Sequence, residues 1–114
     1  MKRKSADEAR LQAECVKWLW NEYPDTRGCF ILVDNNATNV VALMQKKAMG
    51  LVTGAADTFF FWDKRIYFFE FKFGNNKQSP AQIQFQSVAK RHAEEYYLIY
   101  NKLQFTEAIK SILI

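Results

Sequence analysis

The sequence predicts an α/β fold in which a central mixed β-sheet is flanked by helices. Amphipathic helical stretches alternate along the chain with short apolar runs that have the length of strands. The 114 residues, 49% of them hydrophobic and 16% aromatic, are enough for a single domain over residues 1–114 with one core. The predicted order is helix, three strands, helix, strand, helix (α-β-β-β-α-β-α).

The first half of the chain predicts a long helix and a buried strand. Residues 5–22 form the helix, because apolar residues recur there at helical spacing: Leu11, Cys15, Trp18 and Leu19. The apolar run 29–33 is typical of a buried strand. Segment 34–44 has no clear pattern, and Val40–Ala48 is compatible with a short helix. Gly50 and Gly54 then bracket a loop.

The second half predicts a hairpin, a helix, a strand and a last helix. Strands 58–62 and 65–73 are joined by a tight turn at Asp63-Lys64. Ser79 and Pro80 open a helix that runs to about residue 94, with Ser79 as its N-cap and His92 on its inward face. Residues 96–100 form the last strand, and residues 106–113 form the closing helix.

Charge and cysteine content exclude some classes of site. The net charge of +4 and the basic groups at 2–4, 46–47, 64–65 and 90–91 suit either a polyanionic partner or an ordinary solvated surface. Cys15 and Cys29 form no CxxC motif and His92 is the only histidine, which excludes a zinc site of the usual spacing. Without a long apolar run or an apolar leader, we expect no membrane span and a cytoplasmic protein with reduced cysteines.

Two charges in the predicted strand 65–73 need an explanation. Glu70 and Lys72 share one face of that strand with Ile66 and Phe68, where an unpaired buried charge costs several kcal/mol. One explanation is a structural ion pair, in which Glu70 and Lys72 neutralise each other at the end of the strand.

The other explanation is a catalytic site, because a third charge is predicted nearby. If the hairpin strands pair around Asp63-Lys64, Asp57 and Glu70 lie at the same end of the sheet. Two such carboxylates repel each other unless a cation lies between them, and oxygen ligands without His or Cys favour Mg²⁺ or Mn²⁺. Lys72 would face an anion bound to the metal, which is the composition of a site for phosphodiester hydrolysis.

These residues also resemble a known family. Asp57 followed by Glu70-x-Lys72 resembles the PD-(D/E)XK nuclease signature, and the wider pattern resembles its virus-type replication-repair branch, the VRR-NUC domain. The matching segments are Gly50 and Gly54 before Asp57, FFEFK (68–72), SPAQ (79–82) and EARLQ (8–12). The proline that usually precedes the aspartate is replaced by Ala56. The resemblance extends over most of the chain, and it implies a restriction-endonuclease-like core.

The resemblance implies a set of site residues. Asp57, Glu70, the carbonyl of Phe71 and Glu8 would bind the metal, and Lys72 and Gln82 would complete the catalytic set. Two of these assignments have structural alternatives, since Glu8 and Gln82 each lie three residues after a serine N-cap and fit a capping box. Three lysines are candidates for phosphate contacts or are simply exposed: Lys46, Lys47 and Lys77.

The expected function is a Mg²⁺- or Mn²⁺-dependent DNA endonuclease that acts in replication, repair or recombination. The resemblance implies a homodimer of the Holliday-junction-resolvase kind, which acts on branched DNA, and it fits a phage-like origin. Two other functions stay open: a non-catalytic nucleic-acid-binding module that retains the nuclease fold, and a structural or interaction protein.

Overall fold

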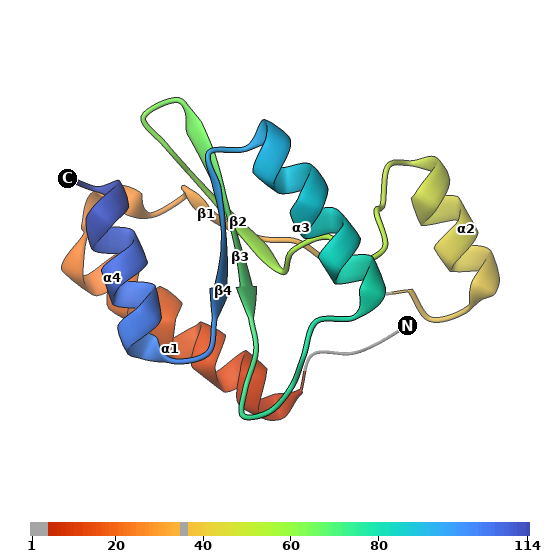
Figure 1. Ribbon diagram of the computed structural model, residues 1–114, viewed down its shortest axis with the longest axis horizontal. Coiled ribbons are helices and arrows are strands. Elements are labelled where there is room, and N and C mark those ends of the chain that lie inside the picture. Colours follow the sequence, from red (N-terminus) through yellow and green to blue (C-terminus); the bar gives the residue numbers. More distant parts are fainter. Residues whose placement is uncertain (1–4, 35–36) are drawn as a thin grey trace.

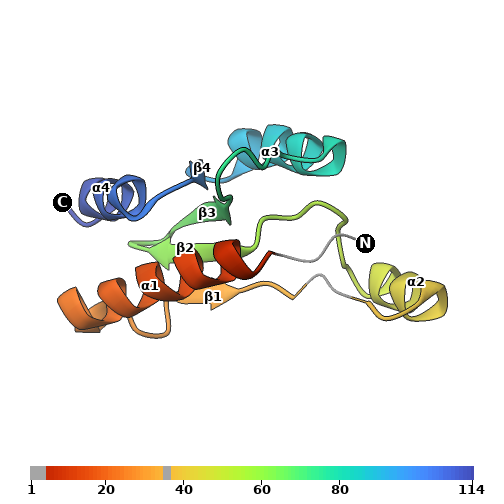
Figure 2. The same ribbon diagram turned by 90° about the horizontal axis from the view of Figure 1, so that it is seen from below.

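The computed structural model describes residues 5–34 and 37–114 and has helices on both faces of a β-sheet (Figures 1 and 2). The helices are α1 (Ala6–Glu22), η1 (Pro24–Thr26, a 3₁₀ turn), α2 (Val40–Ala48), α3 (Pro80–His92) and α4 (Lys102–Ile112). The strands are β1 (Phe30–Leu32), β2 (Thr58–Trp62), β3 (Arg65–Phe71) and β4 (Glu95–Ile99). None of the helices described has the length and apolarity needed to cross a membrane.

The strands of the described chain form one mixed sheet in the order β1-β2-β3-β4. The first two pairings are antiparallel, and β4 pairs parallel to β3 after the crossover through α3. The tight turn predicted between β2 and β3 is present, with Asp63 and Lys64 at φ 52° and 64°. These angles are typical of a two-residue hairpin turn, whose twist matches that of the strands. The mixed α/β sheet with flanking helices is therefore confirmed.

The two faces of the sheet are packed differently. On one face, α1 and α4 cover a core in which Phe60, Phe69 and Phe71 are completely buried and Phe105 of α4 packs against Phe69 and Phe71. The other face lies under α3, where the buried cluster consists of Ala56, Ala89 and Tyr96. Phe68 of β3 and Phe85 of α3 are only partly buried beside that cluster. Because β3 is central and alternates between these faces, Glu70 lies on the α3 side.

Several boundaries differ from the sequence prediction. The observed order contains α2 and η1, which the predicted order omits, although α2 occupies the segment that was compatible with a short helix. Strand β3 ends at Phe71, since Phe73 is half exposed where the chain turns toward Gly74. Helix α4 begins at Lys102, earlier than predicted, because the side chain of Asn101 caps it by accepting a bond from the Gln104 amide.

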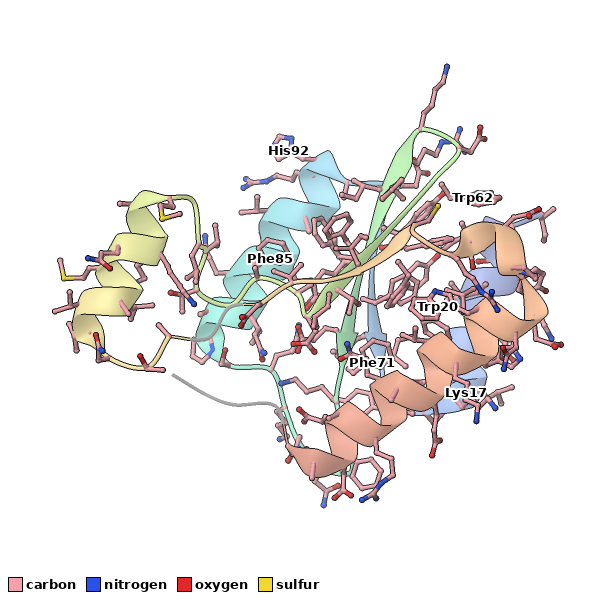
Figure 3. All side chains as sticks on the ribbon, turned by 180° about the vertical axis from the view of Figure 1, so that it is seen from behind. Lys17, Trp20, Trp62, Phe71, Phe85 and His92 are labelled. Atoms are coloured by element: carbon pink, nitrogen blue, oxygen red, sulfur yellow. The ribbon has the colours of Figure 1, made fainter. Side chains whose placement is uncertain are left out.

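One predicted position is wrong and one cannot be compared. His92 is exposed at the end of α3 and extends away from the sheet (Figure 3), whereas the sequence placed it on the inward face. Helix α3 ends at His92, where Ala93 adopts an extended conformation, so the helical periodicity no longer holds the side chain against the core. The basic group at positions 2–4 lies outside the described residues.

Helix α2 stands apart from the sheet and the other helices, at one end of the molecule (Figures 1 and 2). None of its nine described residues is buried. Its outward stripe is apolar, with Val40, Val41 and Met44 exposed by 71%, 66% and 66%. The half-buried side of the helix carries Ala42, Leu43 and Lys46. This distribution is the reverse of an ordinary surface helix, in which the apolar stripe faces the core.

Candidate active site

The hairpin of β2 and β3 places Asp57 and Glu70 opposite each other. Thr58 pairs with Phe69, and one step further along this register Asp57 faces Glu70. The backbone amide of Asp57 donates to Glu70 Oε1 (3.2 Å), and the backbone amide of Phe71 donates to Asp57 Oδ2 (3.2 Å). Each carboxylate thus accepts a bond from the backbone of the opposite strand, just beyond the last pair of β2 and β3, Thr58 and Phe69.

Glu70 and Lys72 are buried together at the end of β3. Glu70 is 2% exposed and Lys72 is 3% exposed. Their closest charged atoms, Lys72 Nζ and Glu70 Oε2, are 3.9 Å apart, which is too long for a hydrogen bond. The two charges therefore attract each other at close range without forming the direct hydrogen-bonded pair that would best neutralise them.

Gln82 of α3 bridges the two charges. Its Nε2 donates to Glu70 Oε2 (3.2 Å), while its Oε1 accepts from Lys72 Nζ (3.0 Å). The same Oε1 accepts from the Ser79 amide (2.8 Å), and Ser79 Oγ accepts from the Gln82 amide, which completes a capping box. The capping-box alternative for Gln82 is confirmed, and the same side chain also joins Glu70 and Lys72 by hydrogen bonds. Exchanging its amide N and O would break all three side-chain bonds, so its orientation is fixed.

Gly54 sets the distance between the Asp57 loop and α3. It has φ +84°, and a Cβ at this position would overlap the backbone of Ala81 in the first turn of α3. Only glycine combines this backbone conformation with so close an approach. The close contact holds the segment before Asp57 against the helix that carries Gln82, so the glycine loop noted in the sequence has a defined structural role.

Glu8 is buried but lies in a different set of contacts. It is 7% exposed, and its Oε2 accepts from Asn76 Nδ2 (2.8 Å) in the loop after β3. Tyr100 Oη donates to the backbone carbonyl of Asn76 (3.1 Å), which ties this loop to the end of β4. Ser5 Oγ caps α1 by accepting from the Glu8 amide, while the carboxylate of Glu8 reaches Asn76. One turn further along α1, Gln12 Oε1 is buried, with no partner among the described residues.

The structure does not gather Glu8, Asp57 and Glu70 into one group. Within residues 5–34 and 37–114, no three acidic, His or Cys side chains lie close enough to hold a metal ion. Phe71, the last residue of β3, lies between Glu70 and Lys72 in the sequence and has its ring in the core. Asp57, Glu70 and a backbone carbonyl are all hard oxygen donors, a chemistry that fits Mg²⁺ or Mn²⁺ with water completing the coordination.

The three lysines proposed for phosphate contacts lie outside this cluster. Lys77 is exposed in the loop between β3 and α3, and Lys47 is exposed on α2. Lys46 is half-buried on the side of α2 that faces the rest of the protein. Lys72 is therefore the only one of the four lysines discussed that is buried in the cluster.

Tyr96 of β4 is a member of this region that the sequence did not indicate. It is 4% exposed, and its hydroxyl accepts from Gln78 Nε2 (3.3 Å), in the segment that leads into α3. Burial raises the pKa of Tyr96 far above its ordinary value, and the nearby charges of Glu70 and Asp57 raise it further. Its proximity depends on the parallel pairing of Phe68 with Tyr96, a non-local contact that local periodicity does not reveal.

Asp57, Glu70, Lys72 and Gln82 form one polar group at the end of two central strands, which we call the charged cluster; Glu70 and Lys72 are buried, and Asp57 and Gln82 are half-buried. It offers carboxylate oxygens for a cation and an ammonium group for an anion, both held by backbone and amide contacts. Comparisons of the sequence with family models and curated proteins, and of the fold with solved structures, returned no match.

Proposed function

We propose that the protein is a Mg²⁺- or Mn²⁺-dependent DNA endonuclease of the PD-(D/E)XK superfamily, similar to its VRR-NUC branch. The observation that carries the proposal is the charged cluster of Asp57, Glu70, Lys72 and Gln82. Glu70 and Lys72 are almost completely buried, yet their charges are 3.9 Å apart with Gln82 between them. A cluster selected for stability alone would close this gap or replace both charges with apolar residues.

Each residue has a role in the proposed reaction. Asp57, Glu70 and the carbonyl of Phe71 would hold the metal ion, and Glu8 would act from its position beside Asn76. The ion supplies Lewis acidity for the scissile phosphate and lowers the pKa of an attacking water. Lys72 stabilises the negative charge that develops on the phosphate, and Gln82 keeps its ammonium group oriented toward that position. Hydrogen bonds made before the substrate arrives reduce the reorganisation needed during the reaction.

The proposed substrate is DNA recognised through its backbone and shape. The net charge of +4 favours a polyanion, and Lys46, Lys47 and Lys77 would contact phosphates around the cluster. We also propose a homodimer that acts on branched DNA, as in Holliday-junction resolvases. The apolar outward stripe of α2 supports a second copy, since a helix of nine residues without a buried side chain needs a partner to be stable.

Cleavage assays with matched variants test this function. Wild type, Glu70→Gln and the exposed control Glu107→Gln are compared on supercoiled plasmid and on a synthetic four-way junction, with EDTA, Mg²⁺ or Mn²⁺. We expect metal-dependent cutting by the wild type and the control, and at least about a hundredfold loss in Glu70→Gln. Glutamine at position 70 retains an oxygen for the Asp57 amide, and circular dichroism checks that both variants are folded under the assay conditions.

Other outcomes identify the alternatives. DNA binding in EDTA without cleavage in either metal would indicate a non-catalytic binding module. A folded wild type that neither cuts nor binds DNA would contradict the nuclease and would return Glu70 and Lys72 to a structural ion pair.

A further inference from the structure

A second feature on the α3 side of the sheet is a cavity of about 470 Å³. We call it the aromatic groove and define it by Phe59 of β2, Ile66 and Phe68 of β3, and Phe85 of α3. Leu51 and Val52, in the loop before Asp57, form another wall, and Lys46 and Asp34 lie among its lining residues. This volume is within the range of small-molecule sites, and it exceeds that of a single nucleobase.

The aromatic groove adjoins the charged cluster. Phe68 lies two residues before Glu70 on the same face of β3, so their Cβ positions are roughly 6–7 Å apart. Ala56, which also lines the groove, immediately precedes Asp57. A nucleotide whose phosphate lies at Asp57 and Glu70 can therefore place its own base, or that of its neighbour, in the groove.

The aromatic side chains of the groove remain partly accessible. On the opposite face of the sheet, Phe60, Phe69 and Phe71 are completely buried, whereas Phe59, Phe68 and Phe85 are only partly buried. Phe85 points from α3 toward the sheet (Figure 3) and meets Phe68 edge to face at 5.1 Å. Partly exposed aromatic rings beside a phosphate site are the usual components of a platform on which unpaired bases stack.

We infer that the aromatic groove binds an unstacked nucleobase of the substrate, next to the phosphate at the charged cluster. This inference rests on the proposed function and narrows it, because only DNA with unpaired or easily unstacked nucleotides near the cut can fill the groove. The net charge of +4 complements the phosphates on either side of such a base, while the lining of the groove itself carries one cation and one anion, Lys46 and Asp34. A continuous duplex keeps its bases stacked and would leave the groove empty.

The test measures binding of two fluorescent DNAs in EDTA at one fixed salt concentration. One is a perfect duplex, and the other is the same duplex with a single unpaired 2-aminopurine. The variants are Phe85→Leu, which keeps an apolar side chain without the ring, and Phe61→Leu as control. Phe61 is a 45% exposed aromatic on β2 that does not line the groove.

We expect Phe85→Leu to bind the unpaired DNA about 5- to 100-fold more weakly and to lose the 2-aminopurine fluorescence change. Its affinity for the perfect duplex should equal that of the wild type, and Phe61→Leu should match the wild type on both DNAs. Phe59→Leu repeats the test at a groove residue of β2. If one of the two variants does not fold, the other still tests the inference.

Three results would overturn the inference. Phe85→Leu and Phe59→Leu could bind both DNAs as the wild type does, or the wild type could show no preference for the unpaired base. The third result is a change of oligomeric state in these variants by light scattering, which would mean that a second copy of the chain fills the groove.

The cleavage assay separates this inference from the nuclease proposal. If the wild type cuts DNA in a metal-dependent way but Phe85→Leu does not change binding of the unpaired DNA, the base-binding role of the groove is rejected and the nuclease proposal stands. If binding of the unpaired base depends on the Phe85 ring but the wild type does not cut DNA, the base-binding role of the groove stands and the nuclease proposal is rejected.

Discussion

Gln82 accounts for two of the features that the sequence left open. A single amide group contacts Glu70, Lys72 and the Ser79 backbone, so the start of α3 and the charged cluster share one side chain. Since the amide lies between the two charges, it offsets part of the cost of burying them. The charged atoms of Glu70 and Lys72 are 3.9 Å apart and both bond to Gln82, which distinguishes the cluster from a directly hydrogen-bonded ion pair.

A double variant tests whether the buried charges serve stability. Replacing only Lys72 with Met leaves Glu70 buried without its cation and should cost about 3–5 kcal/mol of the free energy of unfolding. Replacing both, in Glu70→Gln/Lys72→Met, removes the desolvation of two ions and should restore wild-type stability or exceed it by about 1–4 kcal/mol. Urea unfolding followed by circular dichroism measures both values. A double variant several kcal/mol less stable than the wild type would make the pair structural.

Two buried groups predict a loss of stability in alkaline solution. Burial raises the pKa of the Cys15 thiol from 9.0 to about 12, and it also raises that of Tyr96 from 10.0. The folded state disfavours the anionic form of both groups. Their contribution to the free energy of unfolding is therefore complete below pH 9 and is lost as pH rises toward 12. Above the pKa that each group has in the unfolded chain, that group should lower the free energy of unfolding by up to about 1.4 kcal/mol per pH unit.

Tyr96→Phe provides the control for this pH dependence. It removes the hydroxyl and keeps the ring, so its stability should fall less steeply above pH 10 than that of the wild type. Parallel slopes for the two proteins between pH 10 and 12 would show that Tyr96 does not contribute.

The sequence could predict the part of the cluster that depends on local geometry. Alternation along one strand placed Glu70 and Lys72 together, and a two-residue turn fixed the register that brings Asp57 opposite. Asn76 and Tyr96 could not be found in this way, because their contacts join segments that meet only after α1 and β4 have docked. The partner of Glu8 was missed for the same reason.

At the level of elements, the contact between Gly54 and α3 positions the loop before Asp57. We expect Gly54→Ala to cost at least about 3 kcal/mol, since it adds an overlap with the Ala81 backbone to an unfavourable φ. Gly50→Ala is the matched control: Gly50 has φ +111°, and no atom of the described chain lies within 4 Å of an added Cβ. The control should lose only about 1–2 kcal/mol. Equal losses in thermal unfolding would mean that the close contact relaxes freely.

Elements with strong local signals were predicted well, and those defined by tertiary contacts were not. The strand Thr58–Trp62 and the start of α3 agree with the sequence, because an apolar run and a serine–proline cap mark them. The start of α4 is an exception, because Asn101 as N-cap and the helical spacing of Phe105, Ala108 and Ile109 mark it, yet the predicted helix began too late. The end of α3 was placed too late because Glu94 leaves the helix to donate its amide to Ile66 of β3.

At the level of the whole molecule, the outward stripe of α2 predicts self-association. Met44→Lys places a charge in the middle of the stripe and should convert a dimer into a monomer, with at least about tenfold weaker association. Gln45→Lys adds the same charge to the same helix at the edge of the stripe and should leave the dimer intact. Sedimentation equilibrium of the three proteins measures the effect. A monomeric wild type at high concentration would remove the basis for a two-site enzyme.

Because the hairpin and the following helix supply the whole charged cluster, the cluster can be inherited as one short segment. Asp57, Glu70, Lys72 and Gln82 all lie between positions 57 and 82, so 26 consecutive residues (82 − 57 + 1) carry the whole charged cluster. Gly54, just before this segment, allows the chain to pack closely against the start of α3. A single recombination event that moves one short stretch of gene would therefore carry the complete cluster into another α/β scaffold. The helices α1, α2 and α4 could then diverge around it while the charged cluster stays the same.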